Sequence, residues 1–198
     1  MLYTLLTWLA SPLLWLRLAL GRRRPGPPRV LLIQTAKIGD LICTTPVIAS
    51  IKASRPDCRL TVMVNPVCAP LLAHDPAVDE LWPVPAAEWR GLAGKARLLA
   101  RLAAGRFDDC IVVSPNTAFL LLPFWAGIRR RAAILSNFPS RSLDRCARFL
   151  SHHERHRPGR LLLETELALL RSLGYGQTTT QKRLHPAPGA ADAVAAFF

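Results

Sequence analysis

The chain has 198 residues, 51% of them hydrophobic, and a formal net charge of +13. This length allows one well-packed domain but not two, and the composition excludes a globally disordered chain. The charge is uneven: residues 1–30 hold five arginines and no acid, residues 31–128 nine basic and eight acidic residues, and residues 129–198 twelve and five. Two basic ends fit anionic lipid headgroups or a phosphorylated substrate at least as well as nucleic acid.

Residues 2–20 form an apolar run, LYTLLTWLASPLLWLRLAL, which is followed by the basic residues 22–24. A secretory signal would carry its positive charge before the run rather than after it. The run is nearly long enough to span a bilayer, which takes ~20 residues, but Pro12 and Arg17 interrupt it. We therefore predict that residues 1–24 form a membrane-associating helix with its basic end on anionic headgroups.

Three polar residues at helical spacing, Thr4, Thr7 and Ser11, add a thin polar stripe to this helix. Trp8 and Trp15 suit the membrane interface, where an aromatic ring can be half wet. The stripe favours a helix that lies in the interface. A spanning anchor, or an ordinary first helix packed on the domain, are the alternatives. In either membrane arrangement the arginines remain cytoplasmic.

Residues 25–28 are predicted to be a stiff proline-rich linker, and residues 29–185 an α/β domain. Strands are predicted at 29–34, 59–64, 80–84, 109–113 and 131–135, and helices at 41–54, 66–74, 88–104, 117–126 and 161–173. Residues 136–160 show no clear period. Alternating strands and helices indicate a Rossmann-like parallel sheet with helices on both faces. Ligands bind such sheets beyond the carboxyl ends of the strands.

The first strand-to-helix turn reads Lys37-Ile-Gly39-Asp40. Gly39 allows a tight turn and the close approach of a ligand. Asp40 either caps the helix or acts as a general base toward a hydroxyl group, and Lys37 is either a solvated lysine or a contact for acidic groups. The turn has no GxGxxG and the chain has no P-loop, so a dinucleotide cofactor or ATP at this turn is not expected.

Cysteine and histidine patterns do not predict a metal site. The five cysteines have no CxxC spacing and are expected to be free thiols in a reducing compartment. His152, His153 and His156 cluster among arginines, but no Cys or acidic arrangement supports metal binding there.

Four segments carry a family resemblance: 30–52, 55–57, 60–65 and 70–79. They include the dipeptide GD and the tripeptide TTP, and an NP…VD pattern runs from Asn65-Pro66 to Val78-Asp79. Together they resemble the opening of the heptosyltransferases of lipopolysaccharide synthesis, glycosyltransferase family 9. The resemblance covers residues 29–85 well and 105–175 loosely. It implies the N-terminal, acceptor-binding half of a two-domain, B-type inverting glycosyltransferase. The donor would be a nucleotide sugar such as ADP-heptose, bound mainly by a second domain, and no cofactor is expected.

The resemblance also assigns roles. Asp40 corresponds to the family's general base, and the acceptor is a lipid-linked inner-core oligosaccharide. Residues that could contact this acceptor are Lys37, Gly39, Thr44, Asn65, Asn116 and Arg141. Arginines between 129 and 160 suit its carboxylates and phosphates, although they equally suit a solvated or membrane-facing surface.

Residues 186–198 are expected to begin the connection to a missing donor-binding domain. The predicted location is the cytoplasmic face of the bacterial inner membrane, with the chain peripheral or anchored by its N-terminus. The alternative function is a non-catalytic, membrane-tethered module that binds anionic glycolipid or a partner protein. Nucleic-acid binding is least favoured because no stacking aromatic platform accompanies the basic residues.

Overall fold

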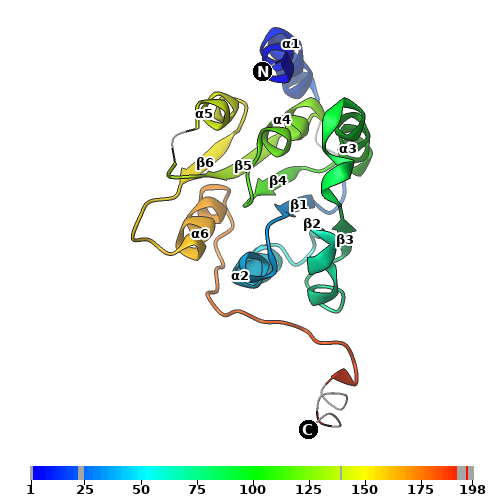
Figure 1. Cartoon of the computed structure of the whole chain (residues 1–198), viewed down its shortest axis with the longest axis vertical. Coiled ribbons are helices and arrows are strands. Elements are labelled where there is room, and N and C mark those ends of the chain that lie inside the picture. The colour runs from blue at the N-terminus through cyan, green and yellow to red at the C-terminus, as the bar shows by residue number, and fades with distance from the viewer. Residues whose placement is uncertain (1, 22–24, 139, 191–194, 196–198) are drawn as a thin grey trace.

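The computed structural model describes residues 2–21, 25–138, 140–190 and 195. Six parallel strands form one sheet in the order β3-β2-β1-β4-β5-β6 (Figure 1). They are β1 (Arg29–Gln34), β2 (Arg59–Val64), β3 (Glu80–Pro83), β4 (Asp109–Val112), β5 (Arg130–Leu135) and β6 (His152–Arg155). The chain order reverses on either side of β1, so the carboxyl ends of β1 and β4 meet at a topological switch point.

Helices cover both faces of this sheet, as predicted. They are α1 (Leu2–Leu20), α2 (Ile38–Ser54), α3 (Gly91–Gly105), α4 (Thr117–Trp125), α5 (Arg141–Ala147) and α6 (Leu162–Ser172), with 3₁₀ helices η1 (Pro66–Leu71) and η2 (Ala86–Glu88). Helices α3, α4 and α5 share one apolar core, and α2 and α6 share the other.

Strand β1 shows why the central strands are continuously apolar. Val30 and Leu32 belong to the core under α2 and α6, whereas Leu31 and Ile33 belong to the core under α3 and α4. All four are essentially inaccessible to solvent. Because both faces of a parallel sheet are covered, alternate side chains are buried in opposite directions and no polar alternation appears.

The sequence-based prediction was wrong in three segments. Residues 136–160 contain α5 and β6. The sequence of β6, His-His-Glu-Arg, gives no strand signal because its side chains are polar and partly exposed. Within the part of the chain that the structure describes, β6 pairs with β5 alone and is an edge strand, and edge strands carry polar residues. The predicted helix 66–74 is 3₁₀ and ends at Leu71, and the predicted helix 88–104 is divided into η2 and α3.

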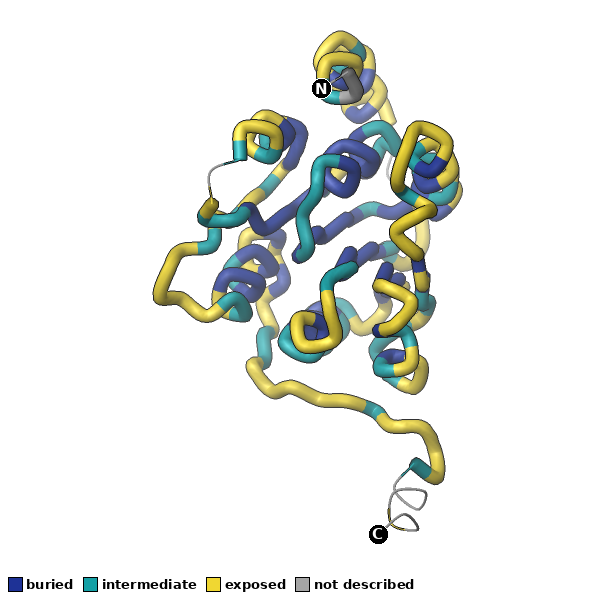
Figure 2. The backbone as a smooth tube through the Cα atoms, viewed as in Figure 1, coloured by how far each residue is buried: buried dark blue, intermediate teal, exposed yellow. Residues whose placement is uncertain are grey.

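Helix α1 is docked on the domain with its polar stripe turned inward. Thr7 is fully buried, and its Oγ1 accepts a hydrogen bond of 2.9 Å from the indole of Trp125. Leu14 and Leu18 pack beside it, whereas Leu9 and Leu13 are more than 70% exposed. Figure 2 shows α1 with buried positions among mostly exposed ones. No helix among the described residues is long and apolar enough to cross a membrane.

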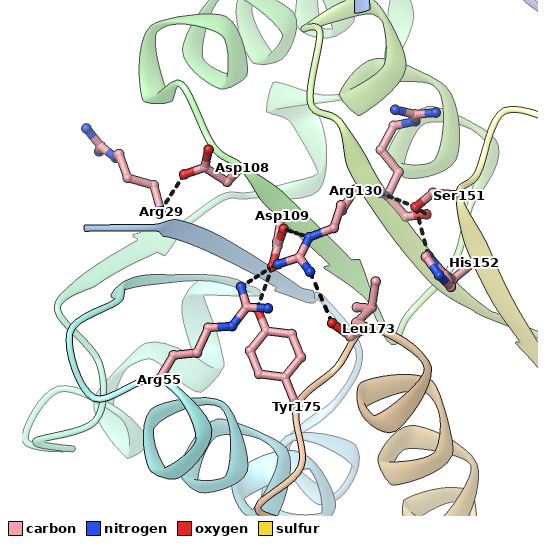
Figure 3. A network of polar contacts seen from close by, with 10 residues as sticks. Arg29, Arg55, Asp108, Asp109, Arg130, Ser151, His152, Leu173 and Tyr175 are labelled. Atoms are coloured by element: carbon pink, nitrogen blue, oxygen red, sulfur yellow. Dashed lines mark hydrogen bonds and ion pairs between the residues drawn. The ribbon is translucent and has the colours of Figure 1, made fainter. Parts of the chain in front are cut away.

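The amino edge of the sheet is fastened by an ionic cluster around Asp109, which is fully buried (Figure 3). Its carboxylate accepts hydrogen bonds from Arg55 at the end of α2 (3.0 Å) and from the hydroxyl of Tyr175 after α6 (2.6 Å). Arg130 of β5 pairs with both carboxylate oxygens and also donates to the carbonyl of Leu173. The cluster therefore joins four elements at the end of the sheet opposite the β1–α2 turn.

Beyond α6, the chain runs back along α2 in an extended conformation (Figure 1). The amide of Gln177 donates to Ser54 Oγ, that of Thr179 to Ser50 Oγ, and that of Arg183 to Thr45 Oγ1. The segment thus passes from the last turn of α2 toward its first turns, where Asp40 lies. The expected start of a connection, residues 186–198, falls mostly outside the described residues.

Candidate functional site

Asp40 is exposed in the first turn of α2, at the carboxyl end of β1. It is the third residue of the helix and does not occupy the cap position that the sequence analysis considered, because the helix begins at Ile38 and Lys37 is the cap residue. The Asp40 carboxylate accepts a hydrogen bond of 3.3 Å from the amide of Lys37. This contact fixes the position of the carboxylate, which faces solvent near the positive end of the helix dipole.

Gly39 has no backbone requirement for glycine. Its φ is not positive, and a Cβ built there would meet no atom within 4 Å. The predicted tight turn is therefore absent, because residues 38–40 already belong to the helix. What glycine provides is an unobstructed surface beside Asp40, which keeps the close approach of a ligand possible.

Three other residues predicted to contact the acceptor also lie at the carboxyl edge of the sheet. Asn65 follows β2, and its Oδ1 accepts from the amide of Val67 (3.2 Å). Asn116 follows β4 and caps α4 through the amide of Phe119 (3.0 Å). Both amide groups keep their NH₂ donors. The exposed Arg141 begins α5, beyond the end of β5.

One hydrogen-bonded pair joins the two loops at the switch point. The amide of Thr35, after β1, donates to Ser114 Oγ at 2.8 Å, and the two hydroxyl oxygens are 3.2 Å apart. Ser114 follows β4, two residues before Asn116. The loop that leads to Asp40 is thereby fixed to the loop that carries Asn116.

Thr44 cannot serve as an acceptor contact, because it is fully buried and its hydroxyl is already engaged. It accepts a hydrogen bond of 2.8 Å from Gln34 Nε2, and its Oγ1 lies 2.9 Å from the carbonyl of Asp40 and 3.2 Å from Glu166 Oε1. The prediction for Thr44 is wrong for a simple reason: it follows Asp40 by one helical turn and lies on the inward side of α2.

Glu166 is the residue that sequence reasoning missed. It lies on α6, is 1% exposed, and its Oε2 has no hydrogen-bond partner. Burial raises the pKa of this carboxyl group to about 7; the hydrogen bond from Thr44 opposes the rise and the nearby charge of Asp40 adds to it. The available signal was an acid within the apolar spacing of Leu162–Leu170, where a charge is costly.

The protonation state of Glu166 determines which acceptor receives the hydroxyl proton of Thr44. Thr44 has one hydroxyl proton for two acceptors. An ionised Glu166 competes with the Asp40 carbonyl for that proton, whereas a protonated Glu166 can donate to Thr44 and leave the proton to the carbonyl. Gln34, Thr44 and Glu166 therefore form a polar cluster beneath the turn that holds Asp40.

The arginines between 129 and 160 do not form one surface. Arg131 is buried, and its guanidinium donates to the carbonyls of Phe149 (2.7 Å) and Ile128; burial lowers its pKa to about 10. Arg130 belongs to the Asp109 cluster at the amino edge. Arg155 pairs with Asp144 (2.5 Å) near the carboxyl edge. These arginines are near one another in the sequence, but β5 carries the chain from the amino edge, where Arg130 lies, to the carboxyl edge, near which Arg155 lies.

Cysteine and histidine have no visible role at this edge. All five cysteines are free, and four are buried. Burial raises the pKa of the Cys146 thiol to about 11 and also raises that of Cys68, with a smaller contribution from Asp40. Within the described ranges, no group of three or more His, Cys, Asp or Glu side chains could hold a metal ion.

The geometry described so far is a Rossmann-like sheet with helices on both faces and an exposed carboxylate at its carboxyl edge. No family model matches the chain. The sequence is 30% identical over 104 residues to lipopolysaccharide heptosyltransferase 2 of Escherichia coli, covering 52% of this chain and 30% of that protein.

Two solved structures share the fold. A glycosyl transferase of family 9 from Veillonella parvula superposes with a TM-score of 0.64 at 22% identity, over 84% of this chain and 47% of the other. E. coli ADP-heptose lps heptosyltransferase II gives a TM-score of 0.64 at 21% identity, over 86% and 50%. The comparisons confirm the resemblance to the heptosyltransferases of family 9. The chain spans about half the length of these solved relatives.

Proposed function

We propose that the chain is the acceptor-binding half of an inverting glycosyltransferase, with Asp40 as the general base. The observation that carries this proposal is the Asp40 carboxylate, exposed at the carboxyl edge of the sheet and anchored by the Lys37 amide. The similarity to heptosyltransferases supports the same reaction class. The anchored carboxylate has accessible lone pairs for one further proton, which is what a base requires.

In this reaction, Asp40 takes the proton of an acceptor hydroxyl group. The oxygen forms a bond to the anomeric carbon of the donor sugar from the face opposite the nucleotide. The bond between that carbon and the diphosphate oxygen breaks, and the nucleoside diphosphate leaves with the bonding electrons. Configuration at the anomeric carbon is inverted, and no redox partner or cofactor is needed. ADP-heptose is the donor we favour, held mainly by residues outside this chain.

The proposed acceptor is a lipid-linked inner-core oligosaccharide of lipopolysaccharide. Lys37 and Arg141 are exposed at the carboxyl edge and would contact its carboxylates or phosphates. Asn65 and Asn116 would use their free NH₂ donors on sugar hydroxyls. Gly39 would allow the acceptor to lie directly against the first turn of α2.

We place the protein on the cytoplasmic face of the bacterial inner membrane, attached through α1. The exposed leucines of α1 and its inward polar stripe support attachment by the outer face of this helix. Trp8 and Trp15, each about 40% exposed, border that face. An interfacial helix buries such a face at the boundary between headgroups and acyl chains.

The test is sugar transfer from ADP-heptose to a lipid-linked core acceptor, measured for the full-length gene product and its Asp40→Asn variant. Loss of a general base lowers kcat by ~10²–10⁴-fold. Asp57→Asn, a change of the same kind at the far end of α2, is the control and should leave the rate unchanged. Full activity in Asp40→Asn, with unchanged folding, would reject Asp40 as the base. Acceptor binding without any transfer by the wild type would favour the non-catalytic module.

A further inference from the structure

A cavity of about 410 Å³ lies at the amino edge of the sheet, where α1, α3 and α4 end. Its walls include Arg17 and Leu18 of α1, Arg106 and Asp108 after α3, and Arg129 before β5. We call it the arginine cavity. It is on the opposite edge from Asp40 and is not part of the candidate glycosyltransferase site. Its volume is within the range of small-molecule sites.

The arginine cavity is lined by more positive than negative side chains. Its lining holds three guanidinium groups and one carboxylate, that of Asp108, which already accepts a hydrogen bond of 2.9 Å from the amide of Arg29. Arg129 donates one hydrogen bond, to a carbonyl in the last turn of α1 (3.0 Å). Within the described residues, the guanidinium groups of Arg17 and Arg106 have neither a hydrogen bond nor an ion pair. These donors remain available to an anion, and guanidinium matches phosphate oxygens in pairs.

Arg106 occupies its position against backbone preference. It ends α3 with φ 50° and ψ 46°, and no other non-glycine residue of the described chain has a positive φ. Glycine is the usual residue at such a left-handed helix end because it has no Cβ to clash. An arginine here costs backbone energy yet places its side chain on the cavity wall, and strain of this kind is typical of functional positions.

Helix-end electrostatics explain only part of this arrangement. Cations near the carboxyl end of a helix offset its partial negative charge, and Arg129 does so for α1. Arg17, in the last turn of α1, and Arg106, at the end of α3, are placed to do the same. Their guanidinium groups nevertheless donate to no terminal carbonyl in the described structure, so this role leaves their hydrogen-bond donors available to a ligand.

The outer face of α1 indicates what the anion belongs to. This face presents Leu9, Leu13 and Leu20, each more than 70% exposed, and it leads directly to the cavity at the end of the helix. An apolar strip that ends in a basic cavity matches acyl chains that end in a phosphate headgroup. A second copy of the chain fits less well, because it would bring the same arginines and the same net charge of +13 to the contact.

We propose that the arginine cavity binds the phosphate of an anionic phospholipid while the outer face of α1 lies among the acyl chains. This rests on the membrane attachment proposed above and adds a specific headgroup contact to it. Arg17, Arg106 and Arg129 would hold the phosphate, and Asp108 would disfavour a second negative charge beside it. The contact would fix the rotation of the domain on the membrane surface, which an apolar helix alone does not.

The experiment measures flotation of the full chain with vesicles of phosphatidylcholine alone and of phosphatidylcholine mixed with phosphatidylglycerol. The variants are Arg106→Gln, Arg106→Gly and the matched control Arg157→Gln, an exposed arginine beyond β6 at the carboxyl edge. A Leu9→Ser and Leu13→Ser double variant tests the apolar face. Competition with soluble glycerol phosphate distinguishes a lipid headgroup from a free phosphate as the ligand.

We expect Arg106→Gln to lower partition into the anionic vesicles roughly fivefold, since one basic residue at the surface contributes about that factor, and to leave partition into neutral vesicles unchanged. Arg106→Gly should bind as weakly as Arg106→Gln but unfold at a higher temperature, because glycine relieves the left-handed strain. A variant that had lost binding through misfolding would unfold at a lower temperature. Arg157→Gln should have a much smaller effect.

Equal losses in Arg106→Gln and Arg157→Gln would overturn the headgroup site and leave a diffuse attraction. Unchanged binding in the Leu9→Ser and Leu13→Ser variant would overturn attachment through α1, whatever the arginines do. Full displacement from vesicles by glycerol phosphate alone would identify a free phosphate site and not a lipid contact.

Discussion

Glu166 shows how one residue couples the candidate site to pH. Burial raises the pKa of its carboxyl group from 4.5 to about 7. The folded chain therefore holds this proton more tightly than the unfolded chain does. Its contribution to the free energy of unfolding is fully present below about pH 4.5 and is lost as the pH rises through 7. The difference between the two pKa values corresponds to roughly 3 kcal/mol.

Replacing Glu166 with Gln should remove this pH dependence. The amide keeps the shape of the neutral acid and carries no charge, so Glu166→Gln should be more stable than the wild type at pH 8 by about 1–3 kcal/mol and little changed at pH 4.5. Urea unfolding at the two pH values measures this. Glu164→Gln, on the exposed side of the same helix, is the control. Parallel pH profiles for wild type and Glu166→Gln would contradict the assignment.

A substitution at Gly39 can test acceptor binding without disturbing the stability of the fold. A methyl group at this position meets nothing within 4 Å, and the backbone there is helical. Gly39→Ala should therefore leave the free energy of unfolding unchanged or raise it by up to about 1 kcal/mol. If the acceptor lies against this turn, the same methyl group should raise the acceptor KM severalfold. Steady-state kinetics of the full-length gene product, with thermal unfolding alongside, test both parts; an unchanged KM would place the acceptor elsewhere.

At the scale of elements, the Asp109 cluster joins α2, β4, β5 and the segment after α6. Removing the Asp109 carboxylate would leave Arg130, only 27% exposed, and the buried Tyr175 hydroxyl without their partner. Asp109→Ala should therefore lower the free energy of unfolding by about 3–5 kcal/mol, the usual cost of breaking a buried pair. Asp144→Ala breaks the exposed pair with Arg155 and should cost less than about 1 kcal/mol. Urea denaturation of both variants would show the contrast, and equal effects would contradict it.

The central elements were predictable because their signals are strong. Five of the six strands come from apolar runs, which a sheet covered on both faces requires. Strand β6 was missed since its stability comes from pairing with β5, a tertiary contact that leaves no hydrophobic pattern in His152–Arg155. The start of α2 was placed three residues late because Ile38 and Gly39 resemble loop residues when read singly.

Side-chain direction limited what could be predicted of the site. Asp40 and its edge of the sheet followed from the strand-to-helix turn, but the inward position of Thr44 depends on where the helix begins. Glu166 lies 126 residues beyond Asp40 in the sequence, and only the packing of α6 against α2 brings it beneath the turn. The orientation of α1 could not be predicted either, because its polar stripe could face water or the domain. The hydrogen bond between Thr7 and Trp125 shows that the stripe faces the domain.

At the scale of the whole molecule, the proposed membrane contacts and the candidate base lie at opposite edges of the sheet. Leu18 and the arginine cavity are at the amino edge, whereas Asp40 follows the carboxyl end of β1. A strand of six residues separates these edges by about 20 Å. The proposed acceptor suits this spacing, because its sugars extend from the lipid into water. A base at that height would meet an oligosaccharide rather than a lipid headgroup.

This arrangement predicts which tryptophans contact lipid. Trp8 and Trp15, on α1, pack against Phe149 and Phe124 but remain about 40% exposed, whereas Trp82 is buried beside Phe107 and Trp89 packs against Phe119. With the outer face of α1 buried ~5–10 Å into the interface, brominated acyl chains should quench the fluorescence of Trp8 and Trp15 only. The Trp8→Phe and Trp15→Phe double variant should then lose most of the quenching, and Trp89→Phe should retain it. Quenching that disappears in Trp89→Phe would mean that the carboxyl edge faces the membrane, which would reverse the proposed orientation and bring Asp40 to the bilayer surface.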